Sequence, residues 1–220
     1  MAEMVLGKQI YRSLDETIKP EHTGLIIVDI QNDFCKEEGH WAKQGKDISH
    51  VQKIIPGLVR LIAGARKAGV PIIYLQNAYG GSYYSPSFMA HMLKRWDNES
   101  QLLYTLEGTW GHQIIDEIKP EKTDFVVKKH RPSGFFGTDL DLILRNINRK
   151  TIIVTGCVTE GCVESTARDG WMRDYYVTIA EDCVASGRPD LHNAQLTLMN
   201  QIYHFVISSE EILKTWDVQR

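Results

Sequence analysis

Apolar runs alternate with segments of helical periodicity from residue 24 to the C-terminus. Runs typical of buried strands occupy residues 24–28, 71–75, 124–127, 151–155, 176–180 and 205–207. Helical spacing fills residues 51–68, 111–118, 138–148, 160–174 and 191–203. This alternation predicts an α/β fold with three layers. About six mostly parallel strands form a doubly wound sheet with helices on both faces. No linker or repeat interrupts the pattern, so we expect one domain over residues 1–220.

Residues 77–110 are the least regular stretch and are rich in Tyr, Ser, Trp and Gly. So long an insertion in a compact domain is typical of a lid or pocket wall. A surface loop or an oligomer contact explains the composition equally well. Both interpretations stay open at the level of sequence.

The composition narrows the classes of partner. A net charge of −3 with scattered basic residues gives no footprint for nucleic acid. No apolar run approaches the roughly 20 residues of a membrane span, and residues 1–20 do not resemble a signal peptide. The four cysteines show no CxxC spacing. We therefore expect a cytoplasmic protein with reduced thiols and without nucleic-acid or membrane partners.

Reactive side chains follow three of the predicted strands. Asp29, the pair Lys128–Lys129 and Cys162 each lie just beyond an apolar run. The carboxyl ends of parallel strands share one edge of a sheet, where α/β proteins place their ligands. A carboxylate, an ammonium group and a thiol would meet there. These groups can serve as the proton acceptor, the cationic partner and the nucleophile of a cysteine enzyme. Strand alternation lets only one of the two lysines face the crevice, without saying which.

Cys162 occupies the turn from a strand into a helix, with Thr159 as a plausible N-cap. Unpaired N–H groups and the helix dipole favour a thiolate at that position and can hold an oxyanion. Burial after four aliphatic residues raises the pKa of Asp29 and makes it a better proton acceptor. Cys35, Cys157 and Cys183 lack such a setting and are expected to be ordinary buried thiols.

Three motifs resemble the isochorismatase-like cysteine hydrolases, and they follow the family order over residues 24–208. The motifs are Ile27-Val-Asp-Ile-Gln-Asn-Asp-Phe34, Lys129-His-Arg-Pro-Ser-Gly-Phe-Phe136 and Gly156-Cys-Val-Thr-Glu-Gly-Cys-Val-Glu-Ser-Thr-Ala-Arg-Asp-Gly170. The resemblance selects Lys129 over Lys128 and implies a triad of Asp29, Lys129 and Cys162. It also implies a cis peptide bond between Val158 and Thr159 beside the oxyanion site.

The resemblance implies a mechanism in which the thiolate forms a thioester and Asp29 shuttles the proton. Nicotinamidases of the family carry a metal-binding Asp and two His after the second strand. This chain has Gln76-Asn-Ala-Tyr-Gly-Gly-Ser82 there, so we expect neither metal nor cofactor. True isochorismatases lack the cysteine. The chain therefore resembles the metal-free C–N hydrolases, whose members are often tetramers or dimers, and we expect a homo-oligomer.

The ureide-hydrolysing branch gives the best match, through Gln76-Asn77, Glu107-Gly-Thr-Trp-Gly111 and Ser133-Gly-Phe-Phe136. That branch includes biuret and triuret hydrolases, ureidoacrylate amidohydrolases and N-carbamoylsarcosine amidases. By resemblance, Asn77, Tyr79 and Gln201 would contact the substrate.

Phe34 is expected to wall the pocket or to belong to the core. Arg131 would clamp a substrate carboxylate or face solvent. We expect an amidohydrolase that releases ammonia from a triuret- or biuret-type ureide. The alternatives are hydrolysis of ureidoacrylate or an N-carbamoyl amino acid, and an inactive domain used for binding.

Overall fold

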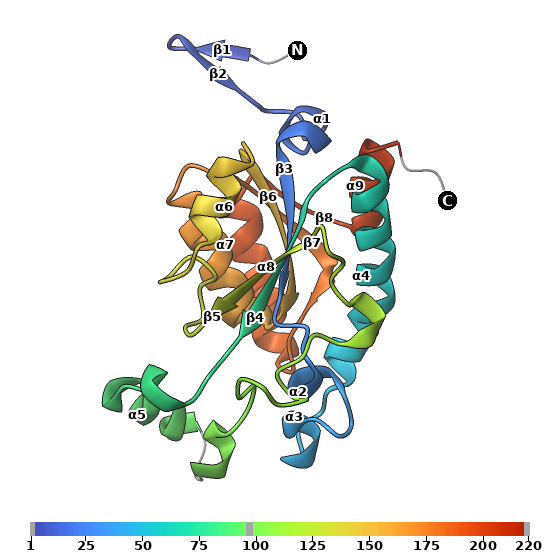
Figure 1. Ribbon diagram of the computed structural model, residues 1–220. Helices are drawn as coiled ribbons and strands as arrows, with labels where there is room; N and C mark the ends of the chain where they lie inside the picture. Colours follow the sequence, from blue (N-terminus) through green and yellow to red (C-terminus); the bar gives the residue numbers. More distant parts are fainter. Residues whose placement is uncertain (1–2, 96–98, 218–220) are drawn as a thin grey trace.

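The computed structural model describes residues 3–95 and 99–217 and has a six-stranded sheet at its centre (Figure 1). The strands lie in the order β5 (Phe125–Lys129), β4 (Ile72–Asn77), β3 (Thr23–Val28), β6 (Thr151–Cys157), β7 (Tyr176–Ala185) and β8 (Phe205–Ile207). Every neighbouring pair is parallel. The predicted α/β fold with about six parallel strands is confirmed.

Alternate residues of β3 face opposite sides of the sheet. Leu25 and Ile27 pack into one buried cluster, and Ile26 and Val28 pack into the other. On the first side lie α4 (Ser49–Ala68) and α9 (Ser209–Thr215), and on the second α6 (Leu140–Asn146), α7 (Glu164–Trp171) and α8 (Pro189–Ile202) (Figure 1). Burial on both faces explains why the strands read as continuous apolar runs.

The helix α4 shows how the sequence specifies these layers. Leu58, Leu61 and Ala65 recur on one face and are fully buried against the sheet. Gly69 ends the helix in the left-handed conformation at φ 74°, which costs glycine little. Within the described ranges 3–95 and 99–217, no helix combines the length and apolar character that crossing a membrane requires.

The N-terminal segment adds a small hairpin that the apolar pattern did not predict. Its strands β1 (Glu3–Val5) and β2 (Lys8–Ile10) pair antiparallel and project from the body of the molecule (Figure 1). A short helix α1 (Leu14–Thr17) and a 3₁₀ turn η1 (Pro20–His22) then lead into β3.

Two long connections gather at the carboxyl ends of the strands (Figure 1). The first contains α2 (Asn32–Cys35) and α3 (His40–Lys43). The second joins β4 to β5 through η2 (Gly81–Tyr83), α5 (Pro86–Arg95), η3 (Glu99–Leu102) and η4 (Asp116–Ile118). A bridge between Tyr79 and Leu106 closes the base of this excursion. The predicted helix over 111–118 is wrong, because only the turn η4 forms there.

Candidate active site

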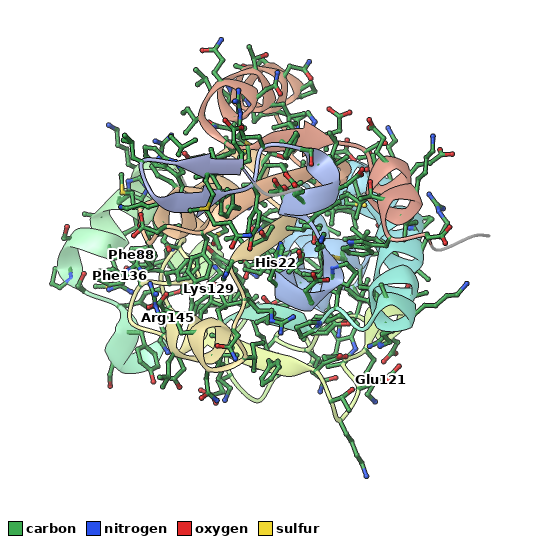
Figure 2. All side chains as sticks on the ribbon, turned by 90° about the horizontal axis from the view of Figure 1, so that it is seen from above. His22, Phe88, Glu121, Lys129, Phe136 and Arg145 are labelled. Atoms are coloured by element: carbon green, nitrogen blue, oxygen red, sulfur yellow. The ribbon has the colours of Figure 1, made fainter. Side chains whose placement is uncertain are left out.

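Asp29, Lys129 and Cys162 meet at the carboxyl edge of the sheet. Asp29 follows the central strand β3, Lys129 is the last residue of β5, and Cys162 lies in η5 (Thr159–Val163) just after β6. The Lys129 Nζ atom lies 2.8 Å from Asp29 Oδ2 and 3.3 Å from Cys162 Sγ. Lys129 is fully buried and is labelled inside the outline of the molecule in Figure 2. The structure therefore brings together the three residues that the resemblance implied, one from each of the strand ends that the apolar pattern singled out.

The two adjacent lysines have opposite environments. The Lys129 side chain is fully buried, whereas Lys128 is exposed and pairs with the Glu107 carboxylate. The Lys129 ammonium also donates to the carbonyl oxygen of Arg131, at 3.3 Å. Of these two lysines, Lys129 is therefore the one that contacts the Cys162 thiol.

Unusual backbone geometry brings the ends of β3 and β6 together. Gly156 has a φ of 104°, and a Cβ atom there would lie 2.0 Å from the Val28 carbonyl oxygen. Asp29 itself has a φ of 55°. The cis peptide bond lies between Cys157 and Val158, so its predicted place between Val158 and Thr159 is wrong by one residue. The chain turns at the last residue of β6, and Val158 is already the extended residue that precedes η5.

Burial dominates the electrostatics of the triad. Desolvation raises the pKa of Asp29, although Lys129 opposes this shift. Burial alone would lower the pKa of Lys129, but the attraction of Asp29 and Cys162 outweighs it, and the net shift is upward. Desolvation raises the pKa of Cys162 to about 12, against the opposing effect of Lys129. The site therefore holds a thiol beside an ion pair.

This state of Cys162 differs from the thiolate expected at a helix N-terminus. The turn η5 is π-helical, and Gly161 inside it has non-helical angles of φ −118° and ψ −106°. Regular alignment of peptide dipoles is therefore interrupted at the cysteine. Cys162 keeps some accessible surface, but protein atoms crowd its sulfur closely enough for desolvation to prevail.

Thr159, the expected oxyanion residue, is fully buried. Its Oγ1 atom lies 2.8 Å from Nδ1 of His192, near the start of α8. The first turn of α8 thus supports η5, which carries Cys162. Val158 is partly buried and packs against the hydrophobic core.

Asn77 and Tyr79 lie on the β4 side of the triad. Asn77 is buried, its Nδ2 donates to Thr105 Oγ1 at 2.7 Å, and its Oδ1 has no hydrogen-bond partner among the described residues. Burial raises the pKa of Tyr79, and the charges of Cys162 and Asp29 add to the shift. The Ala78 N–H, between Asn77 and Tyr79, donates to the Lys129 carbonyl oxygen at 2.9 Å, which places this stretch next to the end of β5.

An aromatic cluster surrounds Tyr79. The Tyr79 ring centroid lies 5.2 Å from that of Tyr104 and 5.4 Å from that of Phe88. Phe34, the predicted pocket wall, belongs both to this cluster, 5.7 Å from Tyr104, and to the hydrophobic core. Tyr104 and Phe88 were missed in the sequence. Their only signal was the high tyrosine content of the irregular stretch.

Arg131 is directed at the irregular segment. Its guanidinium donates to the Tyr83 carbonyl oxygen at 3.0 Å and lies 4.6 Å from the Phe88 ring centroid. The contact holds the segment that contains Phe88 next to the loop that follows Lys129.

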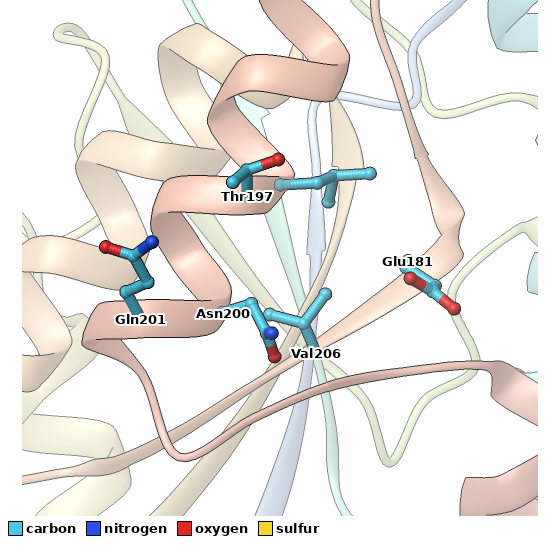
Figure 3. A pocket seen from close by; sticks show the side chains of 6 residues that line it. Glu181, Thr197, Asn200, Gln201 and Val206 are labelled. Carbon is cyan, nitrogen blue, oxygen red and sulfur yellow. The ribbon is translucent and has the colours of Figure 1, made fainter.

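Gln201 lies away from the triad, which corrects its predicted role in the pocket. The helix α8 begins at the carboxyl edge of the sheet and runs back, so Gln201 near its end approaches the amino edge where β8 starts. Gln201 is exposed there and borders a cavity of about 340 Å³ (Figure 3). The other lining residues are Glu181, Leu196, Thr197, Asn200 and Val206.

Metal ligands are not clustered in the described part of the chain. No group of three or more His, Cys, Asp and Glu side chains in residues 3–95 and 99–217 has the geometry to hold an ion. The strand β4 is the second strand of the sequence pattern, after which nicotinamidases carry metal ligands. Here it ends in Asn77, whose side-chain amide donates to Thr105.

Comparison with known proteins matches most of the chain to the model of one protein family. The model of the isochorismatase domain matches residues 23–211. The ureidoacrylate amidohydrolase RutB of an Enterobacter species is 38% identical over 183 residues, covering 79% of this chain and 80% of that protein. RutB of Pseudomonas savastanoi pv. phaseolicola is 33% identical over 211 residues, with 90% and 85% covered.

Solved structures agree with the sequence relatives. A cysteine hydrolase from Pseudomonas syringae pv. phaseolicola superposes with a TM-score of 0.79 at 29% identity, covering 91% of this chain and 95% of that one. The N-carbamoylsarcosine amidase of Thermoplasma acidophilum gives a TM-score of 0.69 at 28% identity, covering 86% and 97%.

Proposed function

We propose that this chain, which belongs to the isochorismatase family of hydrolases, cleaves the C–N bond of a small ureide through a Cys162 thioester. The observation that carries the proposal is the buried contact chain at the sheet edge. A carboxylate, an ammonium group and a thiol follow one another there at 2.8 Å and 3.3 Å. The names of the relatives, ureidoacrylate amidohydrolase and N-carbamoylsarcosine amidase, support a ureido group as the target.

Proton transfer starts the proposed reaction. Cys162 holds a thiol, so a base must remove its proton as the sulfur attacks. Asp29 is the base within reach, because its raised pKa favours acceptance of a proton while Lys129 keeps it ionised. The sulfur forms a bond to the ureido carbonyl carbon, and the carbonyl oxygen becomes an oxyanion.

The oxyanion then collapses and expels nitrogen. Asp29 returns its proton to the departing nitrogen, and ammonia leaves as the C–N bond breaks. Water next gives a proton to Asp29 and attacks the thioester carbon. The C–S bond breaks, a carbamic acid leaves, and Asp29 returns the proton to the Cys162 sulfur, which restores the thiol. We assign the oxyanion to the backbone amides of Thr159 and Cys162 in η5. Lys129 balances the negative charge throughout, from its contacts with both Asp29 and Cys162.

The proposed substrate class rests on the residues beside the triad. Asn77 offers a buried, unpartnered Oδ1, which suits the N–H groups of a urea-like compound. Tyr79, Tyr104 and Phe34 provide flat apolar surface beside it. We propose a linear ureide such as triuret or biuret. Ureidoacrylate is the second candidate, favoured by the relatives that carry this name.

Ammonia release is the direct test. Purified protein is assayed with triuret, biuret, ureidoacrylate, N-carbamoylsarcosine and nicotinamide, before and after treatment with EDTA. We expect turnover of at least one ureide, unaffected by the chelator, and a loss of about 10³-fold or more in Cys162→Ser. Cys183→Ser is the matched control, because Cys183 is buried outside the triad. Activity that survives in Cys162→Ser would refute the nucleophile.

The adjacent lysines provide a second matched pair. Lys129→Met removes the buried cation and should abolish turnover, while Lys128→Met removes an exposed one and should leave kcat unchanged. Lys129→Met also leaves Asp29 without its buried partner, so we expect the free energy of unfolding to fall by about 3–5 kcal/mol. Equal activity in both variants would contradict the assignment.

A further inference from the structure

We infer that Thr105 is a positioning residue, which orients Asn77 toward the ureido N–H groups and thereby sets substrate affinity. The inference rests on the proposed function. Thr105 lies 28 positions after Asn77, in the β4–β5 connection, and its side chain is fully buried. Its part in the site comes from three contacts with residues at the carboxyl edge of the sheet.

Each polar group of Thr105 has a separate partner. Its N–H donates to Asp33 Oδ2 at 2.6 Å. Its carbonyl oxygen accepts from the Tyr79 N–H at 3.3 Å. Its Oγ1 accepts from Asn77 Nδ2 at 2.7 Å. One residue thus joins two of the expected substrate contacts, Asn77 and Tyr79, to a buried carboxylate.

The backbone of Thr105 is held in a conformation that β-branched residues rarely adopt. Its φ is 49°, in the left-handed region. Such a residue persists only where its surroundings fix it, and residues of this kind cluster at functional sites. Here the Asp33 carboxylate fixes it, and this group also accepts from the His40 N–H at 3.0 Å. Gly111 makes room, since a Cβ atom there would lie 2.2 Å from Asp33 Oδ1.

Asn77 depends on Thr105 for the direction of its side chain. The main chain of Asn77 is already fixed by the Gln31 side chain. Gln31 Oε1 accepts from the Asn77 N–H at 2.8 Å, and Gln31 Nε2 donates to the Asn77 carbonyl oxygen at 2.9 Å. The bond to Thr105 holds the Nδ2 end of the side-chain amide and thereby fixes the direction of the Oδ1 end. That end is an acceptor without a partner among the described residues. A substrate N–H would satisfy it, and a buried acceptor left unpaired is costly.

A double-mutant cycle tests the inference on the ureide that the wild type turns over. Thr105→Val keeps the shape and removes the hydroxyl. We expect KM to rise about tenfold with kcat changed by less than about threefold, as for loss of one binding hydrogen bond. In an Asn77→Ala background the same substitution should change KM by less than about twofold, because Thr105 acts through Asn77. Thr105→Ser should restore the wild-type KM.

Thr109→Val is the control, because it removes an exposed hydroxyl from the same segment. It should leave KM unchanged. Additive effects of Thr105→Val and Asn77→Ala, or an unchanged KM in Thr105→Val with a lower midpoint of unfolding, would overturn the inference and leave the proposed function standing. A wild type that turns over no ureide would instead overturn the proposed function, and this inference with it.

Discussion

Burial, more than position on a helix, determines the resting state of Cys162. The strand-end rule was enough to predict that Asp29 and Cys162 share one crevice, and motif resemblance was needed to choose Lys129 over Lys128. The charge state was not predictable from the sequence. It depends on how closely later segments crowd the sulfur and on the π-helical shape of η5, and neither leaves a mark in local composition.

The raised pKa of Asp29 predicts the acid limb of the pH profile. Asp29 must be ionised to accept the thiol proton, so kcat/KM should fall as the pH drops below the pKa of Asp29. Because desolvation raises that pKa, the limb should lie above the ordinary aspartate value of about 3.9. Steady-state rates with the preferred ureide from pH 4 to 8 would measure it. A flat profile down to pH 4 would contradict Asp29 as the base.

At the scale of elements, apolar periodicity predicted the six strands and the long helix α4 well. It failed over residues 111–118, where side chains from distant parts of the sequence form hydrogen bonds with the backbone of this stretch and of Trp110 before it. The Gln31 amide donates to the His112 carbonyl oxygen at 2.7 Å, and the Asn32 amide to that of Trp110 at 2.8 Å. These bonds replace helical ones, and a local pattern contains no record of them.

Gly156 is the position where one substitution should separate β3 from β6. Gly156→Ala places a methyl group against the Val28 carbonyl oxygen and also forces alanine to positive φ. We expect the free energy of unfolding to fall by about 3–5 kcal/mol, from overpacking and backbone strain together. Urea denaturation would measure the loss.

Gly45→Ala is the control for that experiment. Gly45 also has a positive φ, of 73°, but nothing lies within 4 Å of a Cβ atom there. Gly45→Ala should lower the free energy of unfolding by about 1 kcal/mol. Similar losses in both variants would show that strain alone, and not the close approach of the strands, constrains Gly156.

At the scale of the whole molecule, helix direction decided which predicted residues reach the site. The resemblance placed Gln201 in the pocket, but α8 carries it from the carboxyl edge toward the amino edge of the sheet. Thr105 was unremarkable in sequence, yet the path of the β4–β5 connection places it against Asn77 and Asp33. Such placements follow from the complete path of the chain, so residue type and spacing could not predict them.

Trp216 joins the two ends of the chain. Its Nε1 donates to the Ile18 carbonyl oxygen at 2.7 Å within the core. Trp216→Phe keeps the apolar contact and leaves that carbonyl unpaired, so unfolding free energy should fall by about 1–3 kcal/mol. Trp171→Phe, at a residue 43% exposed, should change it by less than about 0.5 kcal/mol. Calorimetry or urea denaturation would compare them, and equal losses would contradict the role of this bond.

The central place of β3 has a consequence for biosynthesis. Its partner β6 is made late, and the bond from Thr155 Oγ1 to the Ile26 carbonyl oxygen spans 129 positions. Closing so large a loop comes at an entropic cost before the strands can pair. A nascent chain that ends before Cys162 holds Asp29 and Lys129 but not the proposed nucleophile. On the proposed mechanism, hydrolytic activity during synthesis would therefore report that β6 has paired with β3 and brought Cys162 to the other two residues.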